Sequence, residues 1–534
     1  MNPSTRQART MVAALLECGV DTVVVAPGSR NGPLSIALAQ AAAAGRIDLH
    51  VRVDERDAAF LALGMARAAR TPIAVLCTSG TATAHFYAAA YEATESGVPL
   101  VLLTADRPAE VRGKGANQTI DQADMFGNAV TFALDLETAG VAPDAHWRDV
   151  VLDAVRASRG SDLIPPGAVH LNIPFAEPLV PGDADTAWVA DLPPVGALAD
   201  RAVLRPHWDA FWPAGARAPR GAIVTSDALQ ADDAIAFARA LGWPLLAEPG
   251  SGARVPDVAI ANYLDAVIDP ALAPDVVVTL GRFALSRPVA AFVKAAPVHI
   301  AVGRLPLDPL DTATGFLNRL PDTDGVAPAP AEWLAAWQRH DAAPPAPTRA
   351  AAYVAATLAE VQPGDLVFYG PSMTIRYAER QAPLFDDRVV SLINRGANGI
   401  DGVVSSALGA ALAHQRRHPG TRAFALMGDL TFMHDIGGLF APADAQQPDI
   451  TFVVIDSDGG RIFRSLEQGA AEYAPVFDAV YGTPHGRDVA AIAAAFGVAA
   501  QRVDTPARLR AEVAATRTQS GISVIVYDDR ESSA

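Results

Sequence analysis

The chain has 534 residues, of which 50% are hydrophobic and 19% are charged, so it is long enough for two to four globular domains. Its formal net charge of −17 argues against non-specific binding of nucleic acid, whose phosphates recruit basic surfaces. Two cysteines, Cys18 and Cys77, cannot form a disulfide framework, and no stretch is long and apolar enough to cross a bilayer. We therefore expect a cytoplasmic protein with no membrane span and no nucleic-acid partner.

The first part of the chain alternates between predicted strands and helices. Strands are expected at residues 22–26, 48–53, 73–77, 99–104 and 168–172. Helices are expected between them, at residues 34–44, 58–69, 82–95 and 147–158. This alternation is typical of a parallel sheet, and it predicts a first α/β domain at residues 1–185. A segment rich in Pro, Asp and Gly follows and reads as a linker.

Two more blocks repeat this pattern. A middle domain is predicted at 196–340, with strands at 222–225, 244–247, 276–280 and 298–302 and a helix at 231–241. After a proline-rich linker, a third domain is predicted at 349–534, with strands at 366–369, 389–393, 423–427, 450–455 and 523–527 and helices at 400–414, 432–440 and 489–496. The expected fold class is α/β, with three doubly wound domains and mostly parallel sheets.

Acidic, glycine-bearing loops follow two strands of the third domain. The first is Gly428-Asp429-Leu430-Thr431-Phe432, and the second is Asp456-Ser457-Asp458-Gly459-Gly460. Ligands bind at the carboxyl ends of strands in doubly wound sheets, so both loops can reach one ligand. Mg²⁺ binds carboxylate oxygens together with substrate phosphates. The pair of loops therefore predicts a metal and diphosphate site, although an Asp at a strand end is also common as a helix cap.

Other polar loops lie at the ends of predicted strands. Asp54-Glu55-Arg56 precedes a helix, where acidic residues also favour the helix dipole. Pro27-Gly28-Ser29-Arg30 and Asp106-Arg107 place arginines where anions bind, although each can be an ordinary turn or surface pair. Residues 113–118 form a glycine-rich polar loop that ends in Gly115-Ala116-Asn117-Gln118, although polar loops are common. The glycine-rich stretch at 394–402 lets a backbone approach a ligand closely.

Together these stretches resemble the thiamine-diphosphate-dependent enzymes. The matching segments occur in that family's order, at 27–30, 54–56, 104–108, 115–118, 372–376, 394–401, 428–432, 459–463 and 482–485. The middle block matches only in its general pattern. The resemblance implies a pyrimidine-binding, a central and a diphosphate-binding domain in that order. It also implies a homodimer or homotetramer, because in this family two subunits share each active site.

The resemblance assigns roles to individual residues. Glu55 contacts the aminopyrimidine and promotes formation of the ylid, and Ile400 holds the cofactor bent. The implied catalytic residues are Glu55, Gln118, Arg395 and Ile400. The implied cofactor-binding residues are Glu55, Ser29, Asn394, Gly396, Ile400, Gly428, Asp429, Leu430, Gly459, Gly460 and Ile462. The implied substrate-binding residues are Arg30, Arg107, Gln118, Arg287, Ser372, Arg376 and Leu466.

Within the family, the resemblance is to transferases of menaquinone biosynthesis that decarboxylate 2-oxoglutarate and add the succinyl unit to isochorismate. Both substrates are polyanionic, which explains arginines at strand ends of an acidic protein. One alternative is another thiamine-diphosphate decarboxylase or carboligase, similar to acetolactate synthase. A second alternative is a non-catalytic α/β binding protein, which needs no carboxyl group at the position of Glu55.

The chain departs from the family pattern at two places. The first is Ser457, where the family often has Asn or Asp. The metal, Mg²⁺ with Mn²⁺ as an alternative, has Asp429 and Gly459 as implied ligands. The remaining ligand is Ser457 if the loops are aligned on the two glycines, and Asp456 if residues are counted from Asp429. The second departure is Ser286-Arg287, where some relatives carry two basic residues, so one positive charge is missing.

Overall fold

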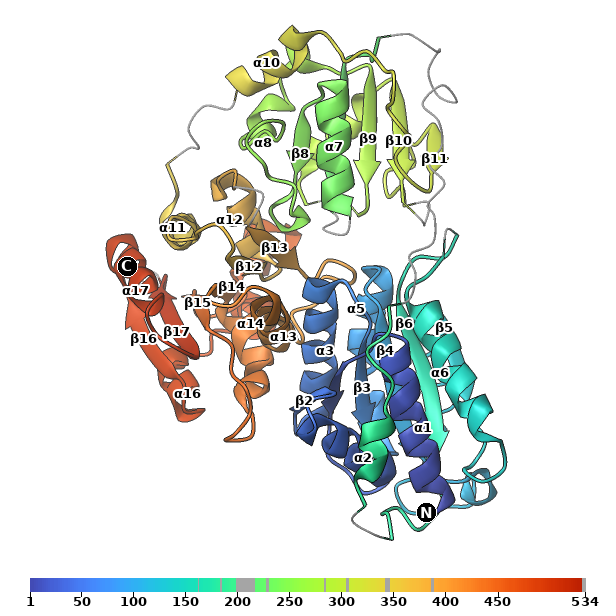
Figure 1. The fold of residues 1–534 in the computed structure, drawn as a ribbon. Helices are drawn as coiled ribbons and strands as arrows, with labels where there is room; N and C mark the ends of the chain where they lie inside the picture. Colours follow the sequence, from blue (N-terminus) through green and yellow to red (C-terminus); the bar gives the residue numbers. More distant parts are fainter. Residues whose placement is uncertain are drawn as a thin grey trace. The chain divides into compact units, whose positions relative to one another are not determined.

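The computed structural model describes residues 1–161, 163–182, 185–197, 217–226, 230–282, 285–303, 307–340, 346–385 and 389–530. Three sheets organise these residues, and every strand pairing described between their neighbouring strands is parallel (Figure 1). The predicted α/β class is confirmed. No helix among the described residues combines the length and apolar character needed to cross a membrane.

By internal contacts the chain divides into two compact units. The first comprises Met1–Arg201, Arg395–Arg417 and Asp435–Gln447. The second comprises Ala202–Asn394, His418–His434 and Pro448–Ala534.

The first unit is built on a six-stranded sheet. Its strand order is β2 (Asp48–Val51), β1 (Thr22–Val25), β3 (Ile73–Cys77), β4 (Leu100–Asp106), β6 (Ala168–Pro174) and β5 (Phe132–Asp135). Its helices are α1 (Pro3–Glu17), α2 (Gly32–Ala43), α3 (Glu55–Ala69), α4 (Thr81–Ala84), α5 (Tyr87–Glu95), α6 (Asp144–Ser158) and α13 (Val403–Arg417). The single helix predicted at 82–95 is thus two helices, and the strands β1, β3 and β4 are buried along their whole length.

Helices α3 and α13 cross with their backbones in contact. A Cβ at Gly64 of α3 would lie 2.0 Å from the carbonyl oxygen of Ser406, and a Cβ at Gly409 of α13 would lie 2.0 Å from that of Leu61. Only glycine allows such an approach, because any side chain would overlap the facing peptide. The crossing fixes the start of α3 relative to the start of α13. Helix α13 begins three residues after Ile400, so this residue lies in a loop and not in the helix predicted at 400–414.

The second unit contains two sheets. The middle sheet has the order β11 (Gly315–Leu317), β10 (Val298–Val302), β9 (Val276–Leu280), β7 (Gly221–Thr225) and β8 (Leu245–Ala247). The last sheet has the order β13 (Val390–Ile393), β12 (Leu366–Tyr369), β14 (Ala423–Gly428), β15 (Ile450–Asp456), β17 (Ile522–Asp528) and β16 (Ala499–Val503). The helices are α7 (Ala231–Leu241), α8 (Tyr263–Ala266), α9 (Arg287–Ala295), α10 (Ala331–Arg339), α11 (Arg349–Leu358), α12 (Met373–Gln381), α14 (Asp429–His434), α15 (Ala474–Phe477), α16 (Val489–Ala495) and α17 (Pro506–Thr516).

A buried polar cluster joins the two sheets of the second unit. Arg254 donates to the carbonyl oxygens of Ala247 at 3.0 Å and Ala382 at 2.6 Å. The hydroxyl of Tyr263 donates to Oε1 of Glu379 at 2.8 Å. Glu379 is only 3% exposed, and burial raises its pKa from 4.5 to about 7. These hydrogen bonds offset part of the cost of burying the polar groups.

Candidate functional site

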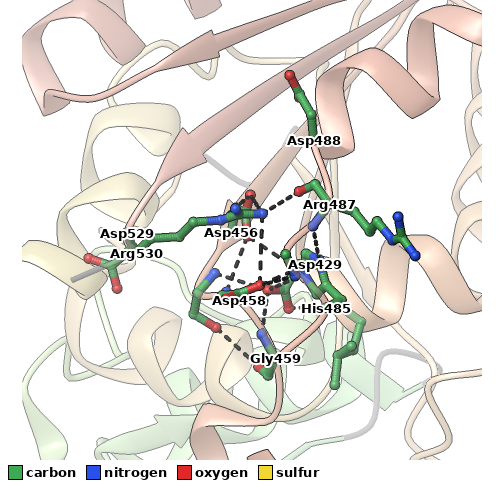
Figure 2. Close-up of polar contacts among 12 residues, drawn as sticks. Asp429, Asp456, Asp458, Gly459, His485, Arg487, Asp488, Asp529 and Arg530 are labelled. Atoms are coloured by element: carbon green, nitrogen blue, oxygen red, sulfur yellow. Dashed lines mark hydrogen bonds and ion pairs between the residues drawn. The ribbon is translucent and has the colours of Figure 1, made fainter. Parts of the chain in front are cut away.

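The two acidic loops meet at the carboxyl edge of the last sheet. Strands β14 and β15 are neighbours in parallel register, with Gly428 opposite Ile455. The residue that follows each of these two in the chain is an aspartate: Asp429 starts α14, and Asp456 ends β15. Both carboxylates are buried, and Figure 2 shows them side by side with Gly459 and His485.

Asp429 is held mainly by backbone N–H groups. Its Oδ2 accepts from the amides of Ser457 at 3.0 Å and Gly459 at 2.9 Å, while Oδ1 accepts from the amide of Leu430 at 2.7 Å. His485 Nε2 lies 3.3 Å from the same Oδ2. Burial raises the pKa of Asp429, and the hydrogen bonds from the amides partly oppose this effect. Among the ion pairs of the described residues, none joins Asp429 to an arginine or a lysine.

Asp456 has a different environment. Its Oδ2 lies 2.6 Å from Arg502 Nη2 and 2.9 Å from Arg530 Nη2. Its Oδ1 accepts from the amide of Asp458 at 3.2 Å. Two guanidinium groups therefore compensate the charge of this buried carboxylate.

The loop after β15 contacts a second segment, residues 482–485, which ends in His485. The hydroxyl of Ser457 donates to the carbonyl oxygen of Gly459 at 3.2 Å. Gly459 has φ of +127°, and a Cβ there would lie 2.1 Å from the carbonyl oxygen of Gly482, so glycine is required at 459. The amide of Gly460 donates to the same carbonyl oxygen of Gly482 at 2.7 Å. This hydrogen bond ties the two segments together.

His485 is a site residue to which sequence reasoning assigned no role of its own. Its Nε2 faces Asp429, its Nδ1 accepts from the amide of Arg487 at 3.0 Å, and Asp458 lies 3.6 Å from Nδ1. One ligand atom each from Asp429, Asp456 and His485 lies within 4.8 Å of the others. The matching segment at 482–485 is the sequence signal that points to this histidine.

In the first unit, Glu55 is the first residue of α3. The preceding Asp54 caps the helix, because its Oδ1 accepts from the amides of Arg56 at 2.8 Å and Asp57 at 3.3 Å. The capping role, which is the alternative explanation for this acidic stretch, therefore belongs to Asp54. Glu55 is partly buried and is not needed as the cap.

Three predicted residues of the first unit converge at the carboxyl ends of its strands. Arg107, after β4, donates to the hydroxyl of Ser79 and to the carbonyl oxygen of Gln118. Gln118 Nε2 donates to the carbonyl oxygen of Ser79 at 2.9 Å. Arg30, after β1, donates to the carbonyl oxygen of Phe175 at 2.9 Å. Burial and the nearby charge of Arg107 lower the pKa of Arg30, so two cations share this edge. Ser29 directly precedes Arg30 in the chain.

The glycine-rich loop before α13 contains four of the predicted residues. Asn394 is buried just after the end of β13. Arg395 Nη1 donates to Oδ1 of Asn398 at 2.8 Å. The amide of Gly396 donates to Glu92, a residue that sequence reasoning did not single out, and Ile400 is partly buried near the end of the loop.

The remaining predicted residues lie in the second unit. Arg376, on the exposed side of α12, donates to the carbonyl oxygen of Ser372 at 2.7 Å. Ile462 and Leu466 lie in the segment that follows the loop at 456–460, and Leu466 is 42% exposed. Arg287 starts α9 on the middle sheet, so it belongs to a different sheet from Asp429. The predicted residues are thus divided between the two units, with Glu55 and Arg107 in one and Asp429 in the other.

Comparison with known proteins agrees with this geometry at both ends of the chain. Residues 5–125 match the family described as thiamine pyrophosphate enzyme, N-terminal TPP binding domain, and residues 390–527 match its C-terminal TPP binding domain. Thiamine pyrophosphate is another name for thiamine diphosphate. The two matched ranges contain Glu55 and Asp429 respectively, and so confirm the cofactor that the motifs indicated.

Three proteins that match nearly the whole chain share the same name. The chain is 40% identical to the 2-succinyl-5-enolpyruvyl-6-hydroxy-3-cyclohexene-1-carboxylate synthase of Saccharopolyspora erythraea, over 98% of this chain and 95% of that protein. It is 41% identical to the synthase of the same name from Thermobifida fusca, over 94% and 92% of the two chains. The corresponding protein of a Nocardioides species is also 41% identical, over 98% and 94%.

A solved structure supports the fold. The chain resembles benzoylformate decarboxylase from Polynucleobacter necessarius with a TM-score of 0.71 and 17% identity, over 98% of each chain. At this identity the likeness extends to the fold alone. The family follows from the relatives at 40–41% identity: the chain belongs to the thiamine-diphosphate-dependent 2-succinyl-5-enolpyruvyl-6-hydroxy-3-cyclohexene-1-carboxylate synthases.

Proposed function

We propose that the chain is a transferase that decarboxylates 2-oxoglutarate and adds the resulting succinyl unit to the alkene of isochorismate in a 1,4-addition, as a step of menaquinone biosynthesis. The identity of 40–41% to synthases of one name over nearly the whole chain carries this proposal. The arginines at the strand ends of the first unit support it, because both substrates carry several carboxylates. A cytoplasmic enzyme acting as a homodimer or homotetramer with shared active sites is part of the proposal.

The proposed domains are a pyrimidine-binding domain at 1–185, a central domain at 196–340 and a diphosphate-binding domain at 349–534. When bound, thiamine diphosphate supplies a nucleophilic carbon and an electron sink for decarboxylation. Glu55 holds or moves a proton at the pyrimidine ring, for which its partly buried place at the start of α3 suits it. Gly428, Asp429, Leu430, Gly459, Gly460 and Ile462 hold the diphosphate and its metal, and Ser29, Asn394, Gly396 and Ile400 hold the rest of the cofactor.

The donor set around Asp429 fits a hard cation such as Mg²⁺. Asp429 supplies a buried carboxylate, and the Ser457 hydroxyl and the Gly459 carbonyl oxygen lie 3.2 Å apart beside it. All three ligand atoms are oxygens, which Mg²⁺ prefers and Mn²⁺ also accepts. A cation would compensate the charge of Asp429, which burial makes costly.

Between the two candidates for the remaining ligand, we favour Ser457 over Asp456. Both arginines that contact Asp456 would compete with a cation for its Oδ2. His485 and Asp456 lie near Asp429, but an imidazole nitrogen suits softer metals than Mg²⁺. These two residues are better explained as supports of the metal loop than as ligands.

The substrate carboxylates require several cations. We assign this role to Arg30 and Arg107 with Gln118 in the first unit, and to Ser372, Arg376 and Arg287 in the second. Arg395 acts near the reacting carbon, and Leu466 contributes to an apolar wall. Arginine suits this task because its planar fork binds a carboxylate through two hydrogen bonds.

A spectrophotometric assay tests the proposal. Purified protein with thiamine diphosphate, Mg²⁺ and 2-oxoglutarate is expected to consume isochorismate, and to do so only with all components present. Product identity is checked by mass spectrometry. Absence of consumption, together with turnover of pyruvate, would instead support a carboligase similar to acetolactate synthase.

A further inference from the structure

One buried carboxylate holds the loop that carries Arg395. Glu92 lies in α5, and only 3% of its surface is exposed. Its Oε1 accepts from the amide of Gly396 at 2.9 Å, and its Oε2 accepts from the amide of Ala397 at 2.7 Å. The two oxygens of a single side chain therefore bind the N–H groups of the two residues that directly follow Arg395.

Two further donors fix the Glu92 carboxylate. Arg67 Nη2 lies 3.1 Å from Oε1, and the hydroxyl of Ser96 donates to the same oxygen at 2.6 Å. Arg67 is 7% exposed and lies near the end of α3, the helix that starts with Glu55. A buried carboxylate with a cation and three other donors is held in one orientation, because moving it would leave a charge unpaired.

The loop also packs closely against α5. A Cβ at Gly396 would lie 2.7 Å from the Ser96 hydroxyl oxygen and 2.8 Å from the carbonyl oxygen of Glu92. Only glycine permits this approach. The Arg395 guanidinium donates to Oδ1 of Asn398. Both the side chain of Arg395 and the backbone that follows it therefore have defined partners.

We propose that Glu92 is a positioning residue: it fixes the backbone of residues 395–398 and thereby the place of Arg395, and Arg67 in turn holds Glu92. The inference rests on the proposed function, in which Arg395 acts near the reacting carbon. A displacement of about 1 Å in a catalytic group can cost about 100-fold in rate, so a loosened anchor affects turnover.

The direct test replaces Glu92 with glutamine. Whichever way the glutamine side chain is turned, its NH₂ group replaces one of the two carboxylate oxygens that accept from Gly396 and Ala397. One backbone N–H group of the loop then faces a donor instead of an acceptor. We expect E92Q to lower kcat by about 10- to 100-fold while KM for both substrates changes by less than about threefold. E92D, which keeps the charge but is too short to reach both amides, is the second variant if E92Q folds poorly.

The matched control is Asp365, another buried carboxylate. It accepts from the amides of Arg422 at 3.0 Å and Gln362 at 2.8 Å and pairs with Arg517 at 2.7 Å. It precedes β12 and holds none of the residues assigned to the reaction. We expect D365N to lower the melting temperature as E92Q does, but to leave kcat within about threefold of the wild type.

Two further measurements separate positioning from general destabilisation. Amide hydrogen exchange of the peptide containing Gly396 and Ala397 is expected to accelerate at least about tenfold in E92Q and to stay unchanged in D365N. In an R395A background, E92Q is expected to lower kcat by less than a further factor of about three, because it acts through Arg395.

Unchanged exchange in E92Q, a kcat equal to that of D365N, or a full multiplicative loss in the double variant would each overturn the proposal. The exchange measurement needs no substrate. If the wild-type protein failed to consume isochorismate, the proposed function would fail, while the exchange result would still decide whether Glu92 anchors the loop.

Discussion

Arg502 Nη2 lies 2.6 Å from Oδ2 of the buried Asp456. This pair distinguishes the two aspartates of the site: within the described part of the chain, Asp456 pairs with two arginines and Asp429 with no arginine or lysine. We therefore expect D429N to weaken Mg²⁺ binding by more than about 100-fold, and D456N to weaken it by less than about tenfold while lowering the melting temperature. Isothermal titration of Mg²⁺ in the presence of thiamine diphosphate measures both effects. Equal losses in the two variants would identify Asp456 as a ligand.

Ser457 gives a second prediction at the same loop. A hydroxyl is a weaker ligand than an amide oxygen, and it reaches less far from the backbone. We expect S457N to tighten Mg²⁺ binding by about tenfold and S457A to weaken it by a similar factor. The same titration checks this, with T518A as a control because the Thr518 hydroxyl donates to the carbonyl oxygen of Ala515, which has no assigned role. If S457A bound the metal like the wild type, Ser457 would not be a ligand.

Glu55 is expected to be needed for turnover but not for folding. The cap of α3 is Asp54, so E55Q should leave the melting temperature nearly unchanged. We expect kcat to fall by about 100-fold or more, because glutamine cannot take part in proton transfer. The affinity for thiamine diphosphate, measured by the quenching of tryptophan fluorescence, should change little. A kcat like that of the wild type would rule out this role.

Arg107 tests the binding of the substrate carboxylates. Replacement by alanine removes a charge-assisted hydrogen bond, so kcat/KM is expected to fall by about 10- to 100-fold with little change in cofactor affinity. R107K retains the charge but not the planar fork and should be intermediate. R148A is a suitable comparison, because Arg148 pairs with Glu17 in the same unit and carries no substrate role here. Unchanged steady-state constants in R107A would contradict the assignment.

The buried Glu379 predicts a pH dependence of stability. Its pKa is about 7 in the folded protein against 4.5 when exposed, so the folded state binds the proton more tightly. This stabilisation is complete below pH 4.5 and is lost as the pH rises through 7, by at most about 3 kcal/mol. E379Q should be more stable than the wild type at pH 8, with a smaller change in free energy of unfolding between pH 5 and 8, which denaturant titrations at each pH measure.

E379A is the control for that comparison. It removes the partner of the Tyr263 hydroxyl and leaves a cavity, so it should destabilise the protein at every pH. An E379Q variant with the same pH profile as the wild type would show that Glu379 does not titrate in this range.

The central strands were predictable from the sequence because their burial leaves a continuous apolar run. The predicted strands 73–77, 276–280 and 366–369 coincide with β3, β9 and β12. The strands that the sequence did not reveal are β5, β11 and β16, and each lies at the edge of its sheet. Their side chains are largely exposed or half-buried, so no apolar pattern distinguishes them from loops.

The site was predictable where chemistry requires a particular residue at a fixed spacing. Asp429 and Gly459 belong to such a motif, and the structure brings them into contact. Glu92 and Arg502 could not be recognised, because an acid or base in an ordinary helix or strand has no local signature. Their roles come from partners far away in the chain, such as Gly396 for Glu92, and only the fold shows these pairs.

The glycine crossing of α3 and α13 has a consequence for exchanging parts between relatives. Residues 395–417 are continuous in sequence with the third block, yet they belong to the same compact unit as α3. A chimaera joined at the linkers would pair α3 of one parent with α13 of another. The two helices tolerate almost no added volume where Gly64 and Gly409 meet the facing backbone. Recombination that respects the fold must therefore transfer these two helices together.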